Sequence, residues 1–182
     1  MNRPKIVSEE QVFPNKTVQE PPKGVIKVTK RTVKEDNGND RVQYIWKRPE
    51  FVTVVPIANG EVLVKREFKY GAMEELLTFA AGAIKNNETP AEAARRELCE
   101  EFGLQSNNLG ELGVYRVSPD KSTEIQHLII AKNCTPIVGA NREPGEILRF
   151  PATTLQILEH PDMRIALCRL AFFEVWRALN LC

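Results

Sequence analysis

The stretch GAIKNNETPAEAARRELCEEFGL, residues 82–104, decides how this chain folds. Its centre predicts a helix that begins after Thr89 and ends before Gly103. Thr89 can cap this helix, Pro90 suits its first position, and Glu92 completes a capping box. Gly103 can adopt the left-handed backbone conformation that ends many helices. Start and stop signals therefore agree on one helix in the middle of the chain.

Three carboxylates crowd together on this helix. Glu97, Glu100 and Glu101 lie three and four residues apart, so they span about 100° of the helix circumference. Like charges in this arrangement are unfavourable without a positive partner, and Arg96 can pair with only some of them. Clustered carboxylate oxygens suit Mg²⁺ or Mn²⁺. A solvated acidic helix with ion pairs four residues apart is the alternative that spacing alone leaves open.

Composition limits the classes of protein to consider. The chain has 182 residues, of which 42% are hydrophobic and 27% charged, and its formal net charge is +1. These values fit one globular domain with a short arm, and they predict neither nucleic-acid nor membrane binding. No apolar run approaches a membrane span, and the N-terminus has no secretory signal, so we expect a cytoplasmic protein. The four cysteines lack CxxC spacing, which argues against a zinc site or a disulfide framework.

Segments typical of strands surround the helix. An Asn-Gly pair within DNGND, residues 36–40, predicts a hairpin between the β-rich runs on either side of it. We expect strands at 24–35, 40–48, 51–57, 61–69 and 76–82, further strands after the helix, and a mostly helical segment at 153–182. Mixed strands with a central and a terminal helix indicate an α+β fold. We expect residues 1–23 to be a loose tail.

The full pattern in residues 82–104 is a complete match to the Nudix box. Its fixed positions are Gly82, Glu88, Arg96-Glu97-Leu98, Glu100-Glu101 and Gly103-Leu104. About ten specified positions in one short stretch make a chance match very unlikely. The segments VVPIANGEVLVKREFKYG (54–71) and SPDKSTE (118–124) resemble the ADP-ribose pyrophosphatase branch of Nudix hydrolases.

This resemblance implies an α/β/α sandwich with a mixed β-sheet. It also implies an N-terminal β-hairpin arm over residues 1–50, ahead of the Nudix hydrolase domain at 51–182. Members of the branch are usually homodimers whose N-terminal strands cross over, so we expect a homodimer through this arm.

The resemblance also assigns roles within the box. Glu97 and Glu101 would be metal ligands together with the backbone carbonyl of Ala81, and Glu100 would contribute a third carboxylate to the Mg²⁺ or Mn²⁺ ion, directly or through water. Glu100 and Arg96 would be part of the catalytic group, and Arg96 with Glu88 would brace the loop and the helix.

Two glycines of the box have conformational roles in this reading. Gly82 would allow a tight turn out of the preceding strand, and Gly103 would allow the exit from the helix. Thr78 and Ala80 depart from the branch, which usually has glutamate and proline at these positions, so a contact from position 78 is lost or changed.

Outside the box, Glu124 would be the general base in the loop at 118–124, and an exposed loop carboxylate is its alternative. Arg66 and Lys69 fall where the branch has basic residues, and they could reach the phosphates or the terminal sugar. Surface basic residues are the alternative for both.

Tyr44 and Trp46 are candidates to stack on a base, with Arg48 as a phosphate contact. Alternation puts the two aromatic residues on one face of their strand, so one of them can instead belong to the core.

The activity that the resemblance implies is Mg²⁺-dependent pyrophosphohydrolysis. The substrate would be ADP-ribose or another nucleoside diphosphate sugar, and the products a nucleoside monophosphate and a sugar phosphate. Two alternatives stay open: a hydrolase of dinucleoside polyphosphates or other nucleotides, and a nucleotide-sensing Nudix module without catalysis.

Overall fold

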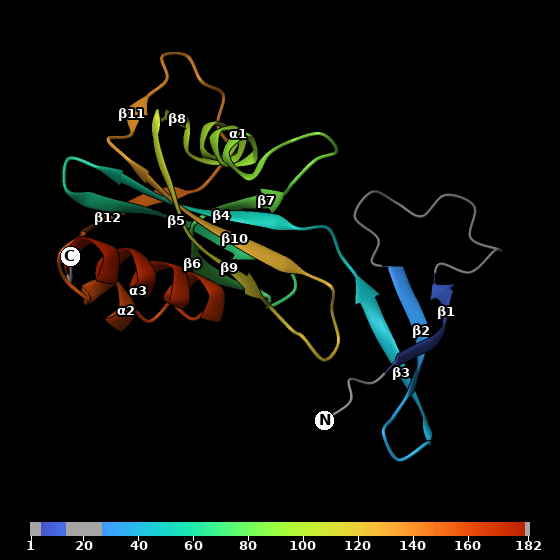
Figure 1. The fold of residues 1–182 in the computed structure, drawn as a ribbon. Helices are drawn as coiled ribbons and strands as arrows, with labels where there is room; N and C mark the ends of the chain where they lie inside the picture. The colour runs from blue at the N-terminus through green and yellow to red at the C-terminus, as the bar shows by residue number, and fades with distance from the viewer. Residues whose placement is uncertain (1–4, 14–26, 181–182) are drawn as a thin grey trace. The chain divides into compact units, whose positions relative to one another are not determined.

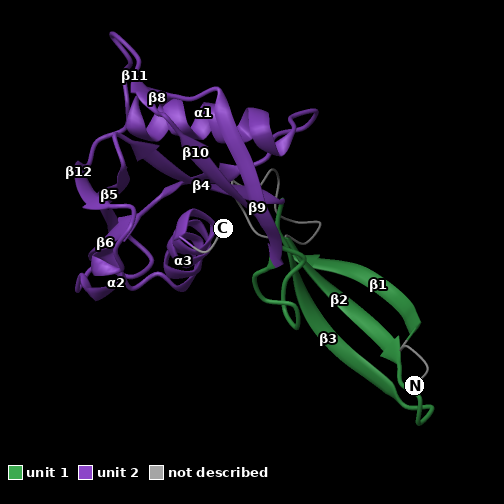
Figure 2. Cartoon of the chain, turned by 60° about the vertical axis from the view of Figure 1, so that its left-hand side comes forward, with its two compact units in different colours: residues 1–49, 116–125 green, residues 50–115, 126–182 purple. Residues whose placement is uncertain are grey.

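The computed structural model describes residues 5–13 and 27–180. Contacts between backbone segments divide the chain into two compact units, residues 1–49 with 116–125 and residues 50–115 with 126–182 (Figure 2). The first unit therefore contains the loop at 116–125, which the sequence did not associate with the N-terminal arm.

The first unit is built on a three-stranded antiparallel sheet of order β1-β2-β3. Its strands are β1 (Lys5–Phe13), β2 (Lys27–Lys34) and β3 (Asp40–Lys47). The hairpin predicted between β2 and β3 is confirmed, and Gly38 in its turn has a φ of 82°.

The expectation of a loose tail is wrong for residues 5–13, because β1 pairs along β2 and its Glu9 lies 3.2 Å from Arg31. The remainder of the expected tail lies outside the described residues.

The loop at 116–125 continues this unit along the end of β3. The Trp46 amide donates to the Lys121 carbonyl at 2.7 Å, and the Thr123 amide donates to the Trp46 carbonyl at 3.0 Å. The Thr123 hydroxyl also accepts from the Arg48 amide at 3.3 Å. These bonds fix the loop to the strand that carries the predicted aromatic residues.

The second unit is a mixed sheet between helices (Figure 1). The strand order is β12-β5-β4-β10-β9, with β6 paired to β5 and β7 paired to β4. Figure 1 shows α1 on one face of this sheet and α2 and α3 on the other. The predicted α+β class is therefore confirmed. The strands are β4 (Phe51–Ala58), β5 (Glu61–Lys69), β6 (Glu74–Thr78), β7 (Ala80–Ala83), β9 (Asn108–Arg116), β10 (Ile125–Lys132) and β12 (Glu146–Pro151).

Within the described part of the chain, three helices and a small second sheet complete the unit. The helices are α1 (Pro90–Phe102), α2 (Gln156–Glu159) and α3 (Ala166–Asn180). The break between α2 and α3 begins at His160-Pro161, where a proline follows the last residues of α2. β8 (Leu104–Gln105) and β11 (Thr135–Pro136) form a separate two-stranded ribbon.

The alternating directions of the side chains along β4 explain why the sheet has a hydrophobic core on each of its faces. Val52 and Val54 pack in the cluster that contains Leu98 of α1, whereas Val55 packs in the cluster that contains Phe172 of α3. Successive side chains of a strand point to opposite faces of the sheet, so a strand buried on both faces reads as a continuous apolar run. β4 is therefore the central strand between the two hydrophobic cores.

Two local features place the box against the sheet. The capping box of Thr89 and Glu92 is formed, and Gly103 ends α1 with a φ of 65°. The strand expected at 76–82 is instead divided at the buried Phe79, where the chain leaves β5 and pairs with β4 as β7. This change of partner puts Gly82 opposite α1.

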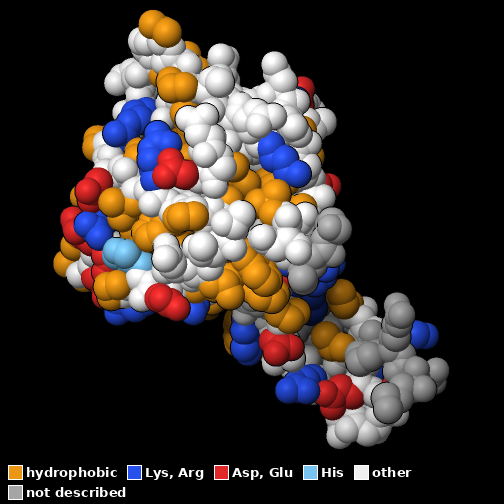
Figure 3. Space-filling model, turned by 90° about the vertical axis from the view of Figure 1, so that its left-hand side faces the viewer, with side chains coloured by type: hydrophobic (Ala, Val, Ile, Leu, Met, Phe, Trp, Pro, Cys, Tyr) orange, Lys and Arg blue, Asp and Glu red, His pale blue; other side chains and the backbone are white. Residues whose placement is uncertain are grey.

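The surface carries both signs of charge. On the face drawn in Figure 3, acidic and basic side chains are interspersed, in keeping with a net charge of +1. Within residues 5–13 and 27–180, no helix is long and apolar enough to cross a membrane.

Candidate metal and active site

The box carboxylates differ in burial. Glu97 and Glu101 are buried, with relative exposures of 7% and 8%, whereas Glu100 is exposed. A Cβ atom on Gly82 would lie 1.8 Å from Oε1 of Glu97. Gly82 lies within β7 and its φ is not in the left-handed region. The predicted tight turn at Gly82 is therefore wrong, and the missing side chain instead makes room for the Glu97 carboxylate.

Arg96 joins the box loop to the helix. Its Nε and Nη2 atoms donate to the two carboxylate oxygens of Glu88 at 2.8 and 2.9 Å. Its Nη2 also donates to the Ala83 carbonyl at 2.9 Å, and its Nη1 contacts Glu97 and lies 3.3 Å from Glu100. Hydrogen bonds from Arg96 and from the Lys85 amide lower the pKa of Glu88 to about 2. The guanidinium thus fixes the loop before α1 and compensates two of the crowded carboxylates.

Glu101 is held by a lysine that the sequence analysis did not single out. The Nζ atom of Lys65 lies 2.7 Å from Glu101, 3.1 Å from Glu67 and 3.3 Å from Glu143. Lys65 is fully buried. Burial lowers the pKa of Lys65, but the hydrogen bonds that its ammonium donates to Glu101 and Glu67 outweigh burial and raise that pKa, so the ammonium is charged. The second Glu101 oxygen accepts from the Ala81 amide at 2.9 Å.

The one sequence signal for this arrangement was a lysine directly after the apolar run Val62-Leu63-Val64. Its partners come from segments far apart in the chain, so spacing does not predict them.

The donor set fits a divalent metal. Oxygen atoms of Glu67, Glu101 and Glu143 lie within 4.8 Å of one another, and carboxylate oxygens are the ligands that Mg²⁺ and Mn²⁺ prefer. The ammonium of Lys65 among them shows that this place stabilises positive charge. The room left by Gly82 brings the Glu97 carboxylate close to β7.

The predicted basic residues of β5 are paired. Arg66 lies 3.0 Å from Glu146 and 3.2 Å from Asp162, and Lys69 contacts Glu67. A cavity of about 320 Å³ borders Arg66 and Glu67. A substrate that reaches Arg66 would have to share its guanidinium with two carboxylates.

The departure at Thr78 has a counterpart on the next strand. The Thr78 hydroxyl donates to Glu67 at 2.9 Å, so a carboxylate lies beside the position where the branch has glutamate.

The other predicted site residues belong to the first compact unit. Tyr44 and Trp46 of β3 have relative exposures of 54% and 48%, so the alternative that one of them is a core residue is wrong. Glu124 lies 3.4 Å from Arg48, and its amide donates to the Ser122 hydroxyl at 3.0 Å. These contacts give the predicted base a cationic neighbour and an ordered backbone.

His127 has a structural role. Its Nδ1 atom lies 2.8 Å from Glu111 and its Nε2 atom 2.9 Å from Glu50. Both ring nitrogens are therefore engaged, and the histidine links β9 and β10 to the residue that precedes β4.

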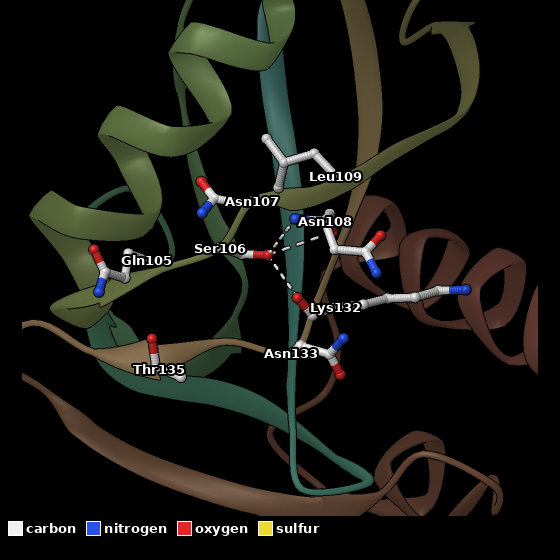
Figure 4. Close-up of a pocket in the computed structure, with 8 residues that line it drawn as sticks. All are labelled: Gln105, Ser106, Asn107, Asn108, Leu109, Lys132, Asn133 and Thr135. Carbon is white, nitrogen blue, oxygen red and sulfur yellow. Dashed lines mark hydrogen bonds between the residues drawn. The ribbon is translucent and has the colours of Figure 1, made fainter.

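A second cavity lies among residues that the sequence did not single out. It has a volume of about 570 Å³ and is lined by the β8–β9 and β10–β11 connections (Figure 4). The Ser106 hydroxyl donates to the Lys132 carbonyl at 2.5 Å and accepts from the Asn108 amide at 3.0 Å. Among the residues that the structure describes, no carboxylate lines this cavity, so these residues offer no site for the metal chemistry of the box.

Comparisons with known proteins agree with this geometry. A family model described as the NUDIX domain matches residues 47–166. The ADP compounds hydrolase NudE of Escherichia coli strain K12 is 34% identical over 136 residues, which cover 71% of this chain and 73% of that protein. A GDP-mannose pyrophosphatase of Yersinia enterocolitica is 29% identical over 128 residues, 65% of this chain and 62% of the relative.

A solved structure is similar over nearly the whole chain. A crystal structure of an ADP compounds hydrolase superposes with a TM-score of 0.82 at 29% sequence identity. The match covers 99% of this chain and 96% of that one.

Proposed function

This chain belongs to the Nudix hydrolase family, and from that premise we propose that it is a Mg²⁺-dependent pyrophosphohydrolase. The substrate is ADP-ribose or another nucleoside diphosphate sugar, and the products are a nucleoside monophosphate and a sugar phosphate. Two relatives support this substrate class, since their names describe an ADP compounds hydrolase and a GDP-mannose pyrophosphatase. The observation that carries the proposal is the pair of buried carboxylates, Glu97 and Glu101, on a helix fixed to β7.

In this proposal Glu97, Glu100 and Glu101 hold the metal together with the Ala81 carbonyl. When bound, Mg²⁺ neutralises diphosphate charge, polarises phosphorus and lowers the pKa of bound water. Mn²⁺ offers the same coordination chemistry. The protein's own contribution is positional, because Arg96 and the space at Gly82 keep the Glu97 carboxylate in one orientation.

Glu124 is the proposed general base. A carboxylate within hydrogen-bond reach of the attacking water takes its proton while the P–O–P bond breaks into two phosphomonoesters. The neighbouring Arg48, 3.4 Å away, supports this role because it restricts the orientation of the carboxylate.

The proposed substrate contacts are residues of β3 and β5 that the sequence indicated. Tyr44 and Trp46 offer half-exposed aromatic faces on which a base can stack. Arg66 and Lys69 supply cations to phosphate or sugar, in exchange with their present carboxylate partners.

The proposal includes a homodimer formed through the first unit. Val42, Tyr44 and Trp46 lie on one face of β3 and are all about half exposed. An apolar sheet face of this kind is a typical contact surface. Light scattering coupled to size-exclusion chromatography tests the dimer, and Val42→Lys should shift it toward the monomer. A monomeric parent would contradict this part.

A cytoplasmic location also belongs to the proposal. Cys99, Cys134 and Cys168 are free thiols, which suits a reducing compartment.

A substrate panel tests the proposed activity. Phosphomonoester release from ADP-ribose, GDP-mannose, UDP-glucose, NADH and diadenosine polyphosphates is measured with Mg²⁺ and a coupled phosphatase. Glu124→Gln should lose about 10²-fold or more in kcat with unchanged Mn²⁺ affinity, and Trp46→Ala should raise KM. Preference for diadenosine polyphosphates would move the substrate class to dinucleotides. Tight nucleotide binding without any turnover would identify a sensing module instead.

A further inference from the structure

The carboxylate cluster of Glu67, Glu101 and Glu143 contains a cation supplied by the chain itself. Lys65 is fully buried, and its ammonium lies between carboxylates of β5, α1 and the loop at 137–145. Long charged side chains are almost never fully buried unless they are paired. Here the pairing is with Glu101, a residue proposed above to hold the metal, so the lysine and the metal have one ligand in common.

The surrounding chain is shaped around this lysine. A Cβ atom on Gly145 would lie 2.7 Å from Cγ of Lys65, and the φ of Gly145 is 145°. The Glu143 amide donates to the Glu100 carbonyl at 2.9 Å, which ties the loop at 137–145 to α1. The glycine lets the loop close over the lysine stem, and the amide bond brings Glu143 to the ammonium. The third carboxylate therefore reaches the cluster through specific backbone geometry.

The charge balance explains what the ammonium does. Three carboxylates whose oxygens lie within 4.8 Å repel one another strongly when partly buried. The ammonium of Lys65 offsets one of these negative charges and leaves two. It also bonds Oε2 of Glu101, while Oε1 accepts from the Ala81 amide, so both oxygens of this carboxylate are already engaged.

We propose that Lys65 is a tethered counter-cation of the metal site. It holds Glu67, Glu101 and Glu143 together when no metal is bound, and it weakens the affinity for divalent metal because the ion must share or displace its contact with Glu101. This inference rests on the proposed function, since it takes Glu101 as a metal ligand. It assigns Lys65 a positioning role that sets how much free metal the enzyme needs.

Mn²⁺ binding to the full chain, followed by the electron paramagnetic resonance of the free ion, tests the proposal without substrate. Lys65→Met removes the charge and keeps much of the volume. It should lower the melting temperature in EDTA by about 5–10 °C and tighten Mn²⁺ binding about tenfold, which is about 1.4 kcal/mol. Lys132→Met is the matched control in the same unit, because no carboxylate among the described residues lies within ion-pair distance of Lys132. It should leave the Mn²⁺ affinity unchanged.

A second variant protects the test against misfolding. The Glu143 side chain is 61% exposed, so Glu143→Gln should fold. It should weaken Mn²⁺ binding about tenfold, because it removes one negative charge beside the proposed ligand Glu101. The double variant of Lys65→Met and Glu143→Gln restores the charge balance and should bind Mn²⁺ about as tightly as the parent. An Mn²⁺ affinity that falls in Glu143→Gln and recovers in the double variant supports the counter-cation role. This comparison does not use the Lys65→Met single variant.

Two other outcomes separate the inference from the proposed function. Equal Mn²⁺ affinity in the parent, Glu143→Gln and the double variant would overturn the role of Lys65 and leave the metal assignment intact. A parent that binds no Mn²⁺ at all would overturn the metal assignment and the inference together.

Discussion

Gly82→Ala tests how closely the sheet and the box helix must approach. The new Cβ would lie 1.8 Å from Oε1 of Glu97 and 2.2 Å from its Cδ. Ordinary contact begins at 3.4 Å, so the carboxylate has to retreat by about 1.6 Å. The φ of Gly82 is not in the left-handed region, so alanine causes no backbone strain. The clash falls on the movable end of a side chain, and the fold should survive.

We therefore expect Gly82→Ala to reduce catalytic activity more than it reduces stability. A misplacement of about 1 Å near an active site can reduce activity about 10²-fold, and added volume at a packed site costs about 1–3 kcal/mol of stability. We expect kcat/KM to fall at least about 10²-fold and the Mn²⁺ affinity to fall with it. Steady-state kinetics and urea unfolding measure the two effects separately.

Gly71→Ala is the matched control for this variant. A Cβ on Gly71 would meet nothing within 4 Å, and its φ is also outside the left-handed region. Its activity should match the parent within about twofold. A Gly82→Ala enzyme with parental kcat/KM and metal affinity would refute the reasoning, because the position of Glu97 would then not matter.

Three further predictions follow from the same contacts. Arg96→Gln should lower the free energy of unfolding by about 2 kcal/mol in urea titrations, because Glu88 and Glu97 lose a charged donor; unchanged stability would contradict the bracing role. Burial lowers the pKa of His127, but the hydrogen bonds with Glu50 and Glu111 and their negative charges outweigh burial and raise that pKa. The stability advantage of the parent over His127→Gln should thus be full below about pH 6.5 and shrink as the pH rises further, and an advantage that grows with pH in thermal melts would be evidence against it. Mg²⁺ at 100 times its Kd should stabilise the EDTA-treated chain by about 2.7 kcal/mol, an effect that Glu101→Gln removes and that calorimetry measures.

Local signals in the sequence predict most of the fold. The ends of α1 depend on Thr89, Pro90, Glu92 and Gly103, all of which lie within one turn of the boundary they define. The hairpin of β2 and β3 depends on an Asn-Gly pair in its turn. β1 was missed because the polar run at residues 8–11 interrupts its apolar residues, and the segment forms a strand by pairing with β2.

The site is predictable only in part, because sequence spacing reveals contacts between residues that are close in the chain and not those between distant segments. Glu97, Glu100 and Glu101 are related by helix periodicity, so their common face follows from the sequence. Lys65 and Glu143 are separated by 78 residues and meet only because the loop at 137–145 is bonded to α1. The role of Gly82 was misassigned because a close approach between a strand and a helix leaves no local signal, whereas a turn does.

The most direct test of the central claim is the ³¹P NMR spectrum of ADP-ribose incubated with the enzyme, in Mg²⁺ and in EDTA, beside Glu97→Gln. We predict that the diphosphate signals are replaced by those of two phosphomonoesters in Mg²⁺ only. The Glu97→Gln variant should be slower by at least about 10²-fold. Equal product formation in EDTA, or an unimpaired Glu97→Gln enzyme, would contradict a metal-dependent pyrophosphohydrolase built on the box carboxylates.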